Sequence, residues 1–403
     1  MAELRVLQVL GSSAGGVARH VAQVAEAAHA DGQPVVVAGP GELEARLTSG
    51  GVVPFRNVQI ADRPGPGDVV AVRRLRSLAV GADVVQAHGL RAGALTVLAC
   101  RSLRRRPGVV VTLHNMPVGG RAVTVIAGVL EHVVARGADT VLGVSDDLVA
   151  RARQRGASVT GRALVPAPPH PAATIPPAEV RAALGVGPGE HLLVTVARLA
   201  PQKGLDLLCD AAGLLAAHRG AEVNGSSGTP DERAGADSGS PFLWVVAGDG
   251  PLEADLAARI SGEGLRVRLL GRRGDVADLM RAADVVVSTA LWEGQPLGVQ
   301  EALALGAPVV ATDVGGTREV TASAAVLVPA DAGALAAAVG TLLSSPDERR
   351  RLGEAALVRA AELPDLAATM RQLTAVWAEA AERARGSRRA RGAGWSGGTG
   401  DVG

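Results

Sequence analysis

The chain has 403 residues, which favours two domains over one, and 47% of its residues are apolar, which allows sizeable cores. Its formal net charge is +1, so the composition gives no overall case for nucleic-acid binding. Cys100 and Cys209 are far apart and indicate no disulfide framework, so we expect a protein of the reducing cytoplasm. The start, MAELRVLQVLGSSAGG, reads as a strand and a glycine loop and not as a signal peptide, and no run of 18 uncharged apolar residues predicts a membrane span.

Apolar runs of strand length alternate with helical patterns along the chain. In the first half these runs are RVLQVL, PVVVAG, DVVQAH, VVVTLH and TVLGVS, and in the second half they are HLLVTVA, FLWVVAG, VRLLG, DVVVST and PVVATD. Continuous Val and Leu runs are typical of strands buried on both faces, as in parallel sheets with crossover helices. The pattern therefore predicts an α/β protein with two doubly wound, Rossmann-like domains of about five strands each.

Proline-rich and glycine-rich segments indicate where the domains divide. Residues 166–179 contain six prolines, which cannot continue a helix or a central strand. The polar, Gly/Ser-rich stretch 219–241 reads as a disordered insertion. The predicted divisions are an N-terminal acceptor-side domain at 1–165, a linker at 166–179, a C-terminal domain at 180–363, a helix at 364–385 and a disordered tail at 386–403.

Charge is divided unevenly between the two halves. Residues 1–170 carry 19 basic and 12 acidic side chains, net +7, whereas residues 171–385 carry 19 and 27, net −8. Arginines cluster at 73–76 and 101–106. The simplest interpretation is a solvated basic face, and the alternative is a surface for acidic lipid or a phosphorylated acceptor. The apolar helix predicted at 121–137 is either a core helix, the favoured interpretation, or a peripheral membrane contact.

In open parallel sheets, ligands bind where strands end and helices begin. Gly15 and Gly16 follow the first predicted strand and would let a phosphate approach backbone N–H groups, although a tight turn is the simpler explanation. His88 and His114 each end a later strand. One such histidine is more often structural, but two at the same edge of a sheet favour a site.

The loop RLAPQKG follows the first strand of the second half and contains Arg198 and Lys203, which is the only lysine of the chain. The two residues are five positions apart across a loop, so both can reach one diphosphate and stabilise it as a leaving group. An ammonium is a compact point charge that suits a narrow anion pocket. The alternative is an ordinary surface lysine. The GxxxxGK[ST] pattern of a P-loop is absent.

The stretch LWEGQPLGVQEALALGAPVVATDVGGTREV carries two acidic residues at a defined spacing. Glu293 lies in a Gly/Pro loop, and Glu301 follows eight positions later in the predicted helix. The N–H groups near Leu297 and Gly298, at the start of that helix, would bind phosphate. Carboxylates beside a phosphate site suit the binding of a sugar, because they accept the hydrogen bonds that its hydroxyl groups donate. The alternative is a pair of acids favoured by the helix dipole.

Together, the E-x7-E spacing, the RLxxxKG loop, the first-loop Gly pair and the closing DVGGTRE resemble the retaining family-4 glycosyltransferases over about residues 4–380. The resemblance implies the GT-B fold, two facing Rossmann-like domains with a C-terminal helix that crosses back onto the N-terminal domain. It implies hexosyl transfer from an NDP-sugar with retention of configuration, in the making of bacterial cell-envelope glycan. No D-x-D motif occurs, so we expect neither a metal nor another cofactor.

The resemblance also implies roles for these residues. Arg198 and Lys203 would hold the donor diphosphate, Glu301 the ribose and Glu293 the sugar hydroxyls. His114 would lie near the sugar and the acceptor. The implied donor-binding set is Gly15, Gly16, Arg198, Lys203, Glu293, Gly294, Leu297, Gly298 and Glu301, and the implied catalytic set is His114, Arg198, Lys203 and Glu293. Gln295 departs from the family, in which many members have Phe at that position, and this changes the expected contacts to the sugar.

The acceptor is left open by the sequence. We expect a glycan, a polyol or a lipid-linked molecule, chosen by the N-terminal domain, with a peripheral membrane contact as one alternative and no nucleic acid. Two other functions are alternatives: a nucleotide-sugar-binding relative without turnover, and a GT-B nucleotide-sugar epimerase. Retention of Arg198, Lys203, Glu293 and Glu301 disfavours the first, and the E-x7-E pattern disfavours the second.

Overall fold

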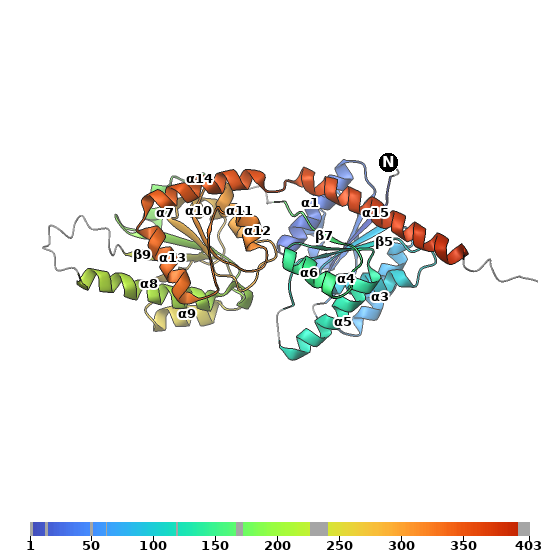
Figure 1. Ribbon diagram of the computed structural model, residues 1–403, viewed down its shortest axis with the longest axis horizontal. Helices are drawn as coiled ribbons and strands as arrows, with labels where there is room; N and C mark the ends of the chain where they lie inside the picture. Colours follow the sequence, from blue (N-terminus) through green and yellow to red (C-terminus); the bar gives the residue numbers. More distant parts are fainter. Residues whose placement is uncertain are drawn as a thin grey trace, which may run out of the picture. The chain divides into compact units, whose positions relative to one another are not determined.

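The computed structural model describes residues 3–12, 15–48, 51–61, 63–117, 120–166, 172–225 and 241–393. The chain divides by its internal contacts into two compact units (Figure 1). Unit 1 comprises Met1–Pro166 with Pro364–Gly403, and unit 2 comprises Ala167–Leu363. Each unit is built around its own parallel sheet, so each has its own edge at which strands end and helices begin.

Unit 1 contains a seven-stranded parallel sheet in the order β3-β2-β1-β4-β5-β6-β7. The strands are β1 (Val6–Leu10), β2 (Val35–Gly39), β3 (Phe55–Asn57), β4 (Val84–His88), β5 (Gly108–Leu113), β6 (Thr140–Gly143) and β7 (Thr160–Arg162). Every residue of β1, β4, β5 and β6 is buried, which is why these strands are mostly apolar along their whole length.

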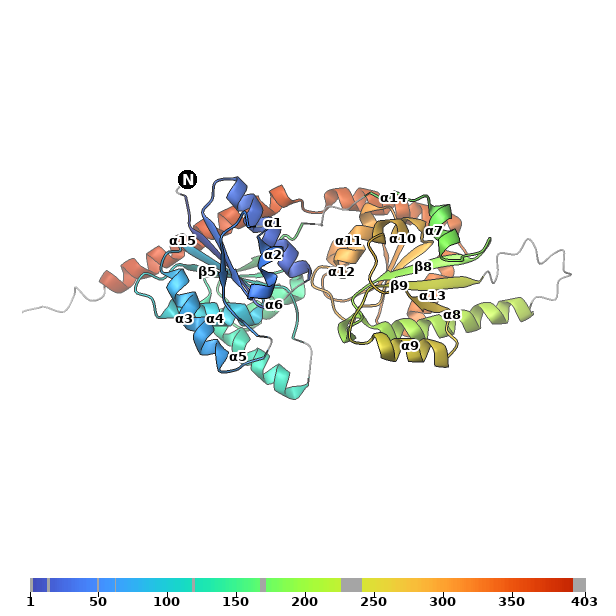
Figure 2. The ribbon, with the colours of Figure 1, turned by 180° about the vertical axis from the view of Figure 1, so that it is seen from behind.

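Helices cover both faces of this sheet. They are α1 (Gly16–Ala30), η1 (Gly41–Leu43), α2 (Glu44–Leu47), α3 (Gly67–Ala79), α4 (Leu90–Arg101), α5 (Arg121–Gly137), α6 (Asp146–Gln154) and α15 (Leu366–Ala393). Figures 1 and 2 show α1 and α15 over one face and α3, α4 and α5 over the other. The last helix lies directly on the sheet: a Cβ on Gly108 would be 2.5 Å from the carbonyl carbon of Ala380, so glycine permits this close approach.

Unit 2 contains a six-stranded parallel sheet in the order β10-β9-β8-β11-β12-β13. The strands are β8 (His191–Val196), β9 (Phe242–Ala247), β10 (Val267–Leu269), β11 (Val285–Ser288), β12 (Val309–Thr312) and β13 (Val326–Val328). The strand order places β8 beside β11 at the centre of the sheet. The two loops that carried the strongest sequence signals therefore leave from neighbouring strands.

Two hydrophobic cores enclose this second sheet. One packs against α8 (Leu205–Gly225), α9 (Glu253–Gly262) and α13 (Ala332–Leu343), and the other against α7 (Pro177–Ala183), α10 (Val276–Ala282), α11 (Leu297–Ala304) and α12 (Thr317–Thr321). The helix α14 (Pro346–Glu362) contributes to both, and η2 (Pro201–Lys203) lies in the loop after β8. Figure 2 shows these two helical layers on opposite faces of the sheet.

The two parallel-sheet domains confirm the predicted fold class, and all ten predicted strands are present. Three further strands, β3, β7 and β13, were not predicted. They are three residues long and lie at sheet edges. The sequences FRN and TGR of β3 and β7 contain no continuous apolar run, whereas VLV of β13 is apolar but short.

Several predicted boundaries differ from the structure. The helix α7 begins at Pro177, inside the predicted linker, because proline is tolerated in the first turn of a helix. The helix α8 runs to Gly225, into the predicted insertion, and α15 runs to Ala393, beyond its predicted end. The remainder of the predicted insertion and of the predicted tail, 226–240 and 394–403, lies outside the described residues, as does 167–171 of the linker.

The helix α5 has the predicted bounds, but its favoured interpretation as a core helix is wrong. Only Ala127, Glu131, Val134 and Ala135 are buried among its 17 residues. Most of its apolar side chains therefore lie at the surface. No helix in the described part of the chain is long and apolar enough to cross a membrane. Both cysteines are unpaired and buried, and burial raises the pKa of Cys100 to about 12 and that of Cys209 to about 11.

Candidate functional site

In unit 2, the loop after β8 is joined to the loop after β11 through the backbone of Lys203. The Thr289 hydroxyl donates to the carbonyl of Lys203 at 2.9 Å, and the Leu291 N–H donates to the carbonyl of Gln202 at 2.9 Å. The next residue, Gly204, has φ +61°, and a Cβ there would be 2.0 Å from the Thr289 carbonyl oxygen. Only glycine fits this junction, so the K-G pair of the sequence motif has a structural cause.

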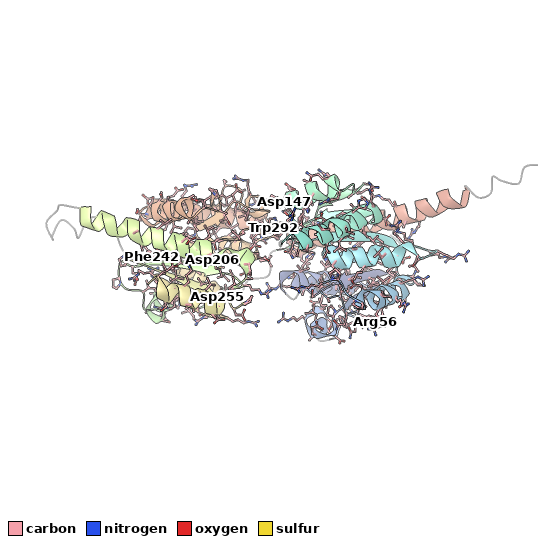
Figure 3. The ribbon with its side chains drawn as sticks, turned by 90° about the horizontal axis from the view of Figure 1, so that it is seen from below. Arg56, Asp147, Asp206, Phe242, Asp255 and Trp292 are labelled. Carbon is pink, nitrogen blue, oxygen red and sulfur yellow. The ribbon has the colours of Figure 1, made fainter. Side chains whose placement is uncertain are left out.

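The loop that carries Glu293 is fixed in turn by the segment after β12. The N–H of Gly316 donates to the Glu293 carbonyl at 2.8 Å. Gly315 has φ +52°, and a Cβ on it would lie 2.0 Å from that carbonyl oxygen and 3.0 Å from Nε1 of Trp292. Figure 3 labels Trp292 in this loop. The glycines of DVGGTRE thus position the Glu293 backbone, a role that the sequence motif alone did not identify.

The side chains of Lys203 and Glu293 form an ion pair between Nζ and Oε1. Their side chains are 24% and 12% exposed, so the pair is largely screened from water but not sealed from a ligand. An ammonium has three N–H donors, and one carboxylate oxygen uses one of them. The remaining donors of Lys203 can bind phosphate oxygens while the second oxygen of Glu293 can accept from hydroxyl groups.

Arg198 lies on the same loop as Lys203 and is exposed. The backbone beside it is paired with the loop after β9: Leu199 N–H donates to the Asp249 carbonyl at 2.8 Å, and Leu252 N–H donates to the Leu199 carbonyl at 3.1 Å. A Cβ on Gly250 would be 2.4 Å from that Leu199 oxygen. The GDG of this segment is therefore a packing turn. Within the described residues Arg198 forms no ion pair, so its guanidinium is available to an anion.

The helix α11 begins against the end of β8. The N–H groups of Val299 and Gln300 both donate to the Pro296 carbonyl at 3.0 Å, so those of Leu297 and Gly298 precede the first helical hydrogen bonds. A Cβ on Gly298 would be 3.4 Å from the Val196 carbonyl oxygen, at the end of β8. Because Glu301 is three residues after Gly298, it shares that face of the helix. The preceding Gly294 is buried in the loop.

In unit 1, Gly15 and Gly16 stand at the start of α1, and Gly15 is the N-terminal cap. The φ of Gly15 is −91°, and no heavy atom lies within 4 Å of the position that a Cβ would take. Packing against the described residues therefore does not require glycine at residue 15. The open space over a helix N-terminus is what an approaching phosphate needs.

The two strand-end histidines of unit 1 contact each other and a third histidine. Nδ1 of His88 lies 3.1 Å from Nε2 of His114, and the ring of His20 packs edge-on at a centroid distance of 5.8 Å from each. All three are buried, at 3%, 2% and 8% exposure for His20, His88 and His114. The sequence analysis missed His20, because it lies within α1 and not at a strand end.

Burial keeps these histidines uncharged. Desolvation lowers the pKa of His20 from 6.5 to about 4 and that of His114 to about 3, and each charged ring would also repel its neighbours. The pKa of His88 lies well below its ordinary value for the same reasons, burial first. In the described part of the chain, no group of three or more His, Cys, Asp or Glu side chains is arranged to hold a metal ion. The cluster therefore presents neutral hydrogen-bonding rings.

The site residues fall into two sets. Arg198, Lys203, Glu293, Gly294, Leu297, Gly298 and Glu301 lie on the loops after β8 and β11 and on α11, all in unit 2. Gly15, Gly16 and His114 belong to unit 1. Within unit 2 the structure brings Lys203 and Glu293 into contact, although the sequence analysis assigned them to different parts of the donor.

Two family models match this chain, one in each unit. The family model described as "Glycosyl transferases group 1" matches residues 178–359, and the model described as "Glycosyl transferase 4-like domain" matches residues 15–169. The two matches correspond to the sheets of unit 2 and unit 1, respectively, and leave only the termini and a short junction unmatched.

Individual relatives match over different lengths. The lipopolysaccharide core biosynthesis mannosyltransferase LpsB of Rhizobium meliloti is 33% identical over 44% of this chain and 47% of its own length, so the alignment spans about half of that protein. A D-inositol 3-phosphate glycosyltransferase of Thermobispora bispora is 29% identical over 87% of this chain and 83% of its own length.

Among solved structures, Anabaena Alr3699/HepE in complex with UDP superposes with a TM-score of 0.71 at 21% identity, covering 93% of this chain and all of that one. At that identity the likeness shows the fold. Since the two family models together cover both units, and since the parallel sheets have the fold of these enzymes, the chain belongs to the glycosyltransferases, in the family-4 type with the GT-B fold.

Proposed function

We propose that the chain transfers a hexosyl group from an NDP-sugar to a glycan, polyol or lipid-linked acceptor, with retention of configuration and without a metal. The observation that supports this most is the contact between Lys203 and Glu293, held by interlocked loops at the end of a parallel sheet. It places a cation for a diphosphate beside a carboxylate for sugar hydroxyls, which are the two chemical halves of such a donor.

In this proposal the donor spans the loops of unit 2. Lys203 and Arg198 bind the diphosphate, with the N–H groups of Leu297 and Gly298 at the positive end of α11. Glu301, on the same face of α11 as Gly298, accepts hydrogen bonds from the ribose hydroxyls. Glu293 accepts from hydroxyls of the sugar. The compact ammonium of Lys203 fits beside the Glu293 carboxylate where a planar guanidinium would displace it.

Catalysis then follows from charge stabilisation. As the bond from the sugar to the diphosphate breaks, negative charge grows on the leaving phosphate, and Lys203 and Arg198 stabilise it. The acceptor hydroxyl attacks the anomeric carbon from the side on which the phosphate leaves, and the leaving phosphate takes its proton, so the configuration is retained. Fixed cations fill the role that a divalent ion has in metal-dependent transferases. His114 is assigned to hydrogen bonding near the sugar and the acceptor, as a neutral ring.

A thermal-shift screen of NDP-sugars and free nucleotides in EDTA tests the donor site. A matching NDP-sugar at a hundredfold excess over Kd is expected to raise Tm by roughly 5–10 °C. The shift should be lost in Lys203→Ala and kept in Arg350→Ala, whose exposed guanidinium lies on α14 in the same unit. A folded protein whose Tm responds to no nucleotide would overturn the donor-site assignment.

Product analysis separates transfer from the two alternatives. A transferase releases NDP slowly by donor hydrolysis and faster when an acceptor is added. A binding relative without turnover shifts Tm but releases nothing, and an epimerase converts the donor without any acceptor. Acceptor-dependent NDP release in EDTA, lost in Lys203→Ala, is the result that the proposal expects.

The exposed side of α5 supports a lipid-linked acceptor in particular. Val123, Val125, Ile126 and Val129 are 45%, 67%, 42% and 60% exposed, and Arg121 begins the helix. An apolar helical face with flanking arginine suits the boundary of an anionic membrane. One relative, 35% identical over 19% of this chain, is a UDP-Gal:alpha-D-GlcNAc-diphosphoundecaprenol alpha-1,3-galactosyltransferase of Escherichia coli. Flotation on anionic liposomes at low and high salt tests this contact, and no binding at low salt would end it.

A further inference from the structure

Buried polar side chains in unit 1 form a continuous hydrogen-bond network that leads from α15 through β4 and β1 to the histidines. It begins at Trp377 of α15, whose indole N–H donates to Oε1 of Gln86 at 2.7 Å. Oε1 of Gln86 also accepts from Nε2 of Gln8 at 3.3 Å, and Nε2 of Gln86 donates to the Thr112 hydroxyl at 3.0 Å. Gln8 and Gln86 are fully buried and pair across β1 and β4, so these amides have no access to water.

This hydrogen-bond network continues from Gln8 to the histidine cluster. Oε1 of Gln8 lies 2.7 Å from Nε2 of His88, and Nδ1 of His88 lies 3.1 Å from Nε2 of His114. Each contact needs one donor and one acceptor. The direction in which the hydrogen bonds run therefore decides which nitrogen of each ring carries the proton.

The indole fixes that direction because it can only donate. Gln86 must present its oxygen to Trp377, so Gln8 must present its NH₂ group to that same oxygen. The oxygen of Gln8 then faces His88, whose Nε2 must carry a proton.

The remaining proton positions on His88 and His114 follow because both rings are neutral. With its proton on Nε2, a neutral His88 has its lone pair on Nδ1, so Nε2 of His114 must be the donor to it. His114 is then left with its lone pair on Nδ1. Without the indole, the hydrogen bonds of the network have no preferred direction from donor to acceptor. The amide groups can turn over, and the Thr112 hydroxyl can donate or accept.

We propose that Trp377, Gln86, Gln8 and His88 are positioning residues that hold His114 in the Nε2–H tautomer with Nδ1 as its free acceptor. A helix at the C-terminal end of the chain thereby sets the proton arrangement of a ring at the end of β5. The tautomer itself follows from contacts within unit 1, whereas its effect on turnover rests on the role proposed for His114. In the reversed arrangement two buried N–H groups would face each other, which corresponds to a preference of roughly tenfold to hundredfold for the direction described.

Nitrogen-15 NMR of the histidine rings in the full-length chain tests the proposal. Two-bond proton–nitrogen correlations distinguish the two neutral tautomers, and the signals of His88 and His114 are assigned by their loss in His88→Gln and His114→Gln. The wild type is expected to show the Nε2–H tautomer at both residues. The Nδ1–H tautomer at His114 would overturn the proposal.

Trp377→Phe removes the donor but keeps an aromatic ring, and it is expected to give a mixture of the two tautomers. The matched control is Trp244→Phe, because that buried indole donates to the Thr195 hydroxyl at 3.0 Å within unit 2. It should leave both histidine patterns unchanged. A single, unchanged tautomer in a folded Trp377→Phe would show that the indole does not set the direction.

Turnover gives a second readout. If only the Nε2–H form is competent, a mixture in Trp377→Phe lowers kcat by about twofold to tenfold with little change in KM for the donor. Absence of any transferase activity in the wild type would refute the proposed function and leave the tautomer result standing. An altered tautomer with unchanged kcat would refute the positioning role.

Discussion

In unit 1 the polar side chains near the ends of the strands are neutral and buried, whereas in unit 2 they are charged and partly exposed. Unit 1 connects Trp377, two glutamines and the histidines through side-chain hydrogen bonds. Unit 2 places Lys203 against Glu293 by hydrogen bonds among three loops, two between backbone groups and one from the Thr289 hydroxyl to a backbone carbonyl.

The difference concerns what holds each group in place. A neutral side-chain network depends on the protonation state of every member, since a single charged ring would reverse a donor or acceptor. A backbone-held ion pair depends on loop geometry, and hence on glycines where a Cβ would collide. The two units should therefore fail under different changes.

Acid should destabilise unit 1 before unit 2. The folded-state pKa values of His20, His88 and His114 are lowered, so below pH 6.5 the unfolded chain binds more protons than the folded one. Stability that is complete above pH 6.5 is lost as the pH falls towards about 4, by about 3 kcal/mol for His20, and the lowered pKa values of His88 and His114 act in the same direction.

Unit 2 has a different acid response. Burial raises the pKa of Asp284, but hydrogen bonds from His191, the Leu192 N–H and Arg181 outweigh it and hold that pKa below 3.8. The stability from Asp284 is present above pH 3.8 and is lost only below it. Hydrogen exchange at pH 7 and pH 4.5, followed by peptide mass, should show lost protection in β1, β4 and β5 but not in β8 and β11. Equal loss in both sheets would contradict the contrast.

Replacing the cation of unit 2 should stop the reaction without unfolding the unit. Lys203→Ala is expected to lower kcat by roughly 10²–10³, about 3–4 kcal/mol, because it removes one fixed charge from the leaving phosphate. Lys203→Arg should also be impaired, since the guanidinium does not fit beside Glu293. Steady-state kinetics with a saturating donor measures this. Turnover close to the wild type in Lys203→Arg would show that the pocket does not need an ammonium.

Removing a glycine should displace the charged pair indirectly. Gly315→Ala is expected to cost about 2–3 kcal/mol of unfolding free energy, because the new Cβ meets the Glu293 carbonyl at 2.0 Å on a backbone with φ +52°. Donor affinity should fall with it. The control is Gly262→Ala at the end of α9, where no heavy atom lies within 4 Å. Urea unfolding compares the two, and equal midpoints would mean that the loop can move aside.

The exposed face of α5 should tolerate change better than any part of either network. The double variant Val125→Ser/Val129→Ser replaces side chains that are 67% and 60% exposed, so we expect less than about 1 kcal/mol of change in unfolding free energy. If α5 contacts a membrane, flotation of this variant on anionic liposomes should nevertheless fall. A large loss of stability would place α5 in a packed interface.

Ten of the thirteen strands, and the loops that follow them, could be predicted from the sequence alone. Continuous Val and Leu runs arise wherever a strand is buried on both faces, so the pattern was sufficient for the two parallel sheets. The same reasoning placed Glu293 in a loop and Glu301 in the helix after it. It did not find β3 and β7, because FRN and TGR lack that pattern, nor β13, because its apolar run VLV is only three residues long.

A polar residue inside a buried strand was a signal that could have been used further. Gln8 in RVLQVL and Gln86 in DVVQAH interrupt otherwise apolar runs, and a fully buried amide requires a partner. The strands indicated that partners must exist but not which residues supply them. For the same reason His20 could not be placed beside His88 and His114, since it comes from a helix on the face of the sheet.

Contacts between residues far apart in the sequence could not be predicted from it. Lys203 and Glu293 are 90 positions apart, and Trp377 and Gln86 are 291 apart. Local propensity and periodicity act over a few residues, so they fix what each segment becomes. Contacts across such distances depend on strand order, on the return of α15 to the first sheet, and on glycines that let two backbones approach, and these are set when the sheets assemble.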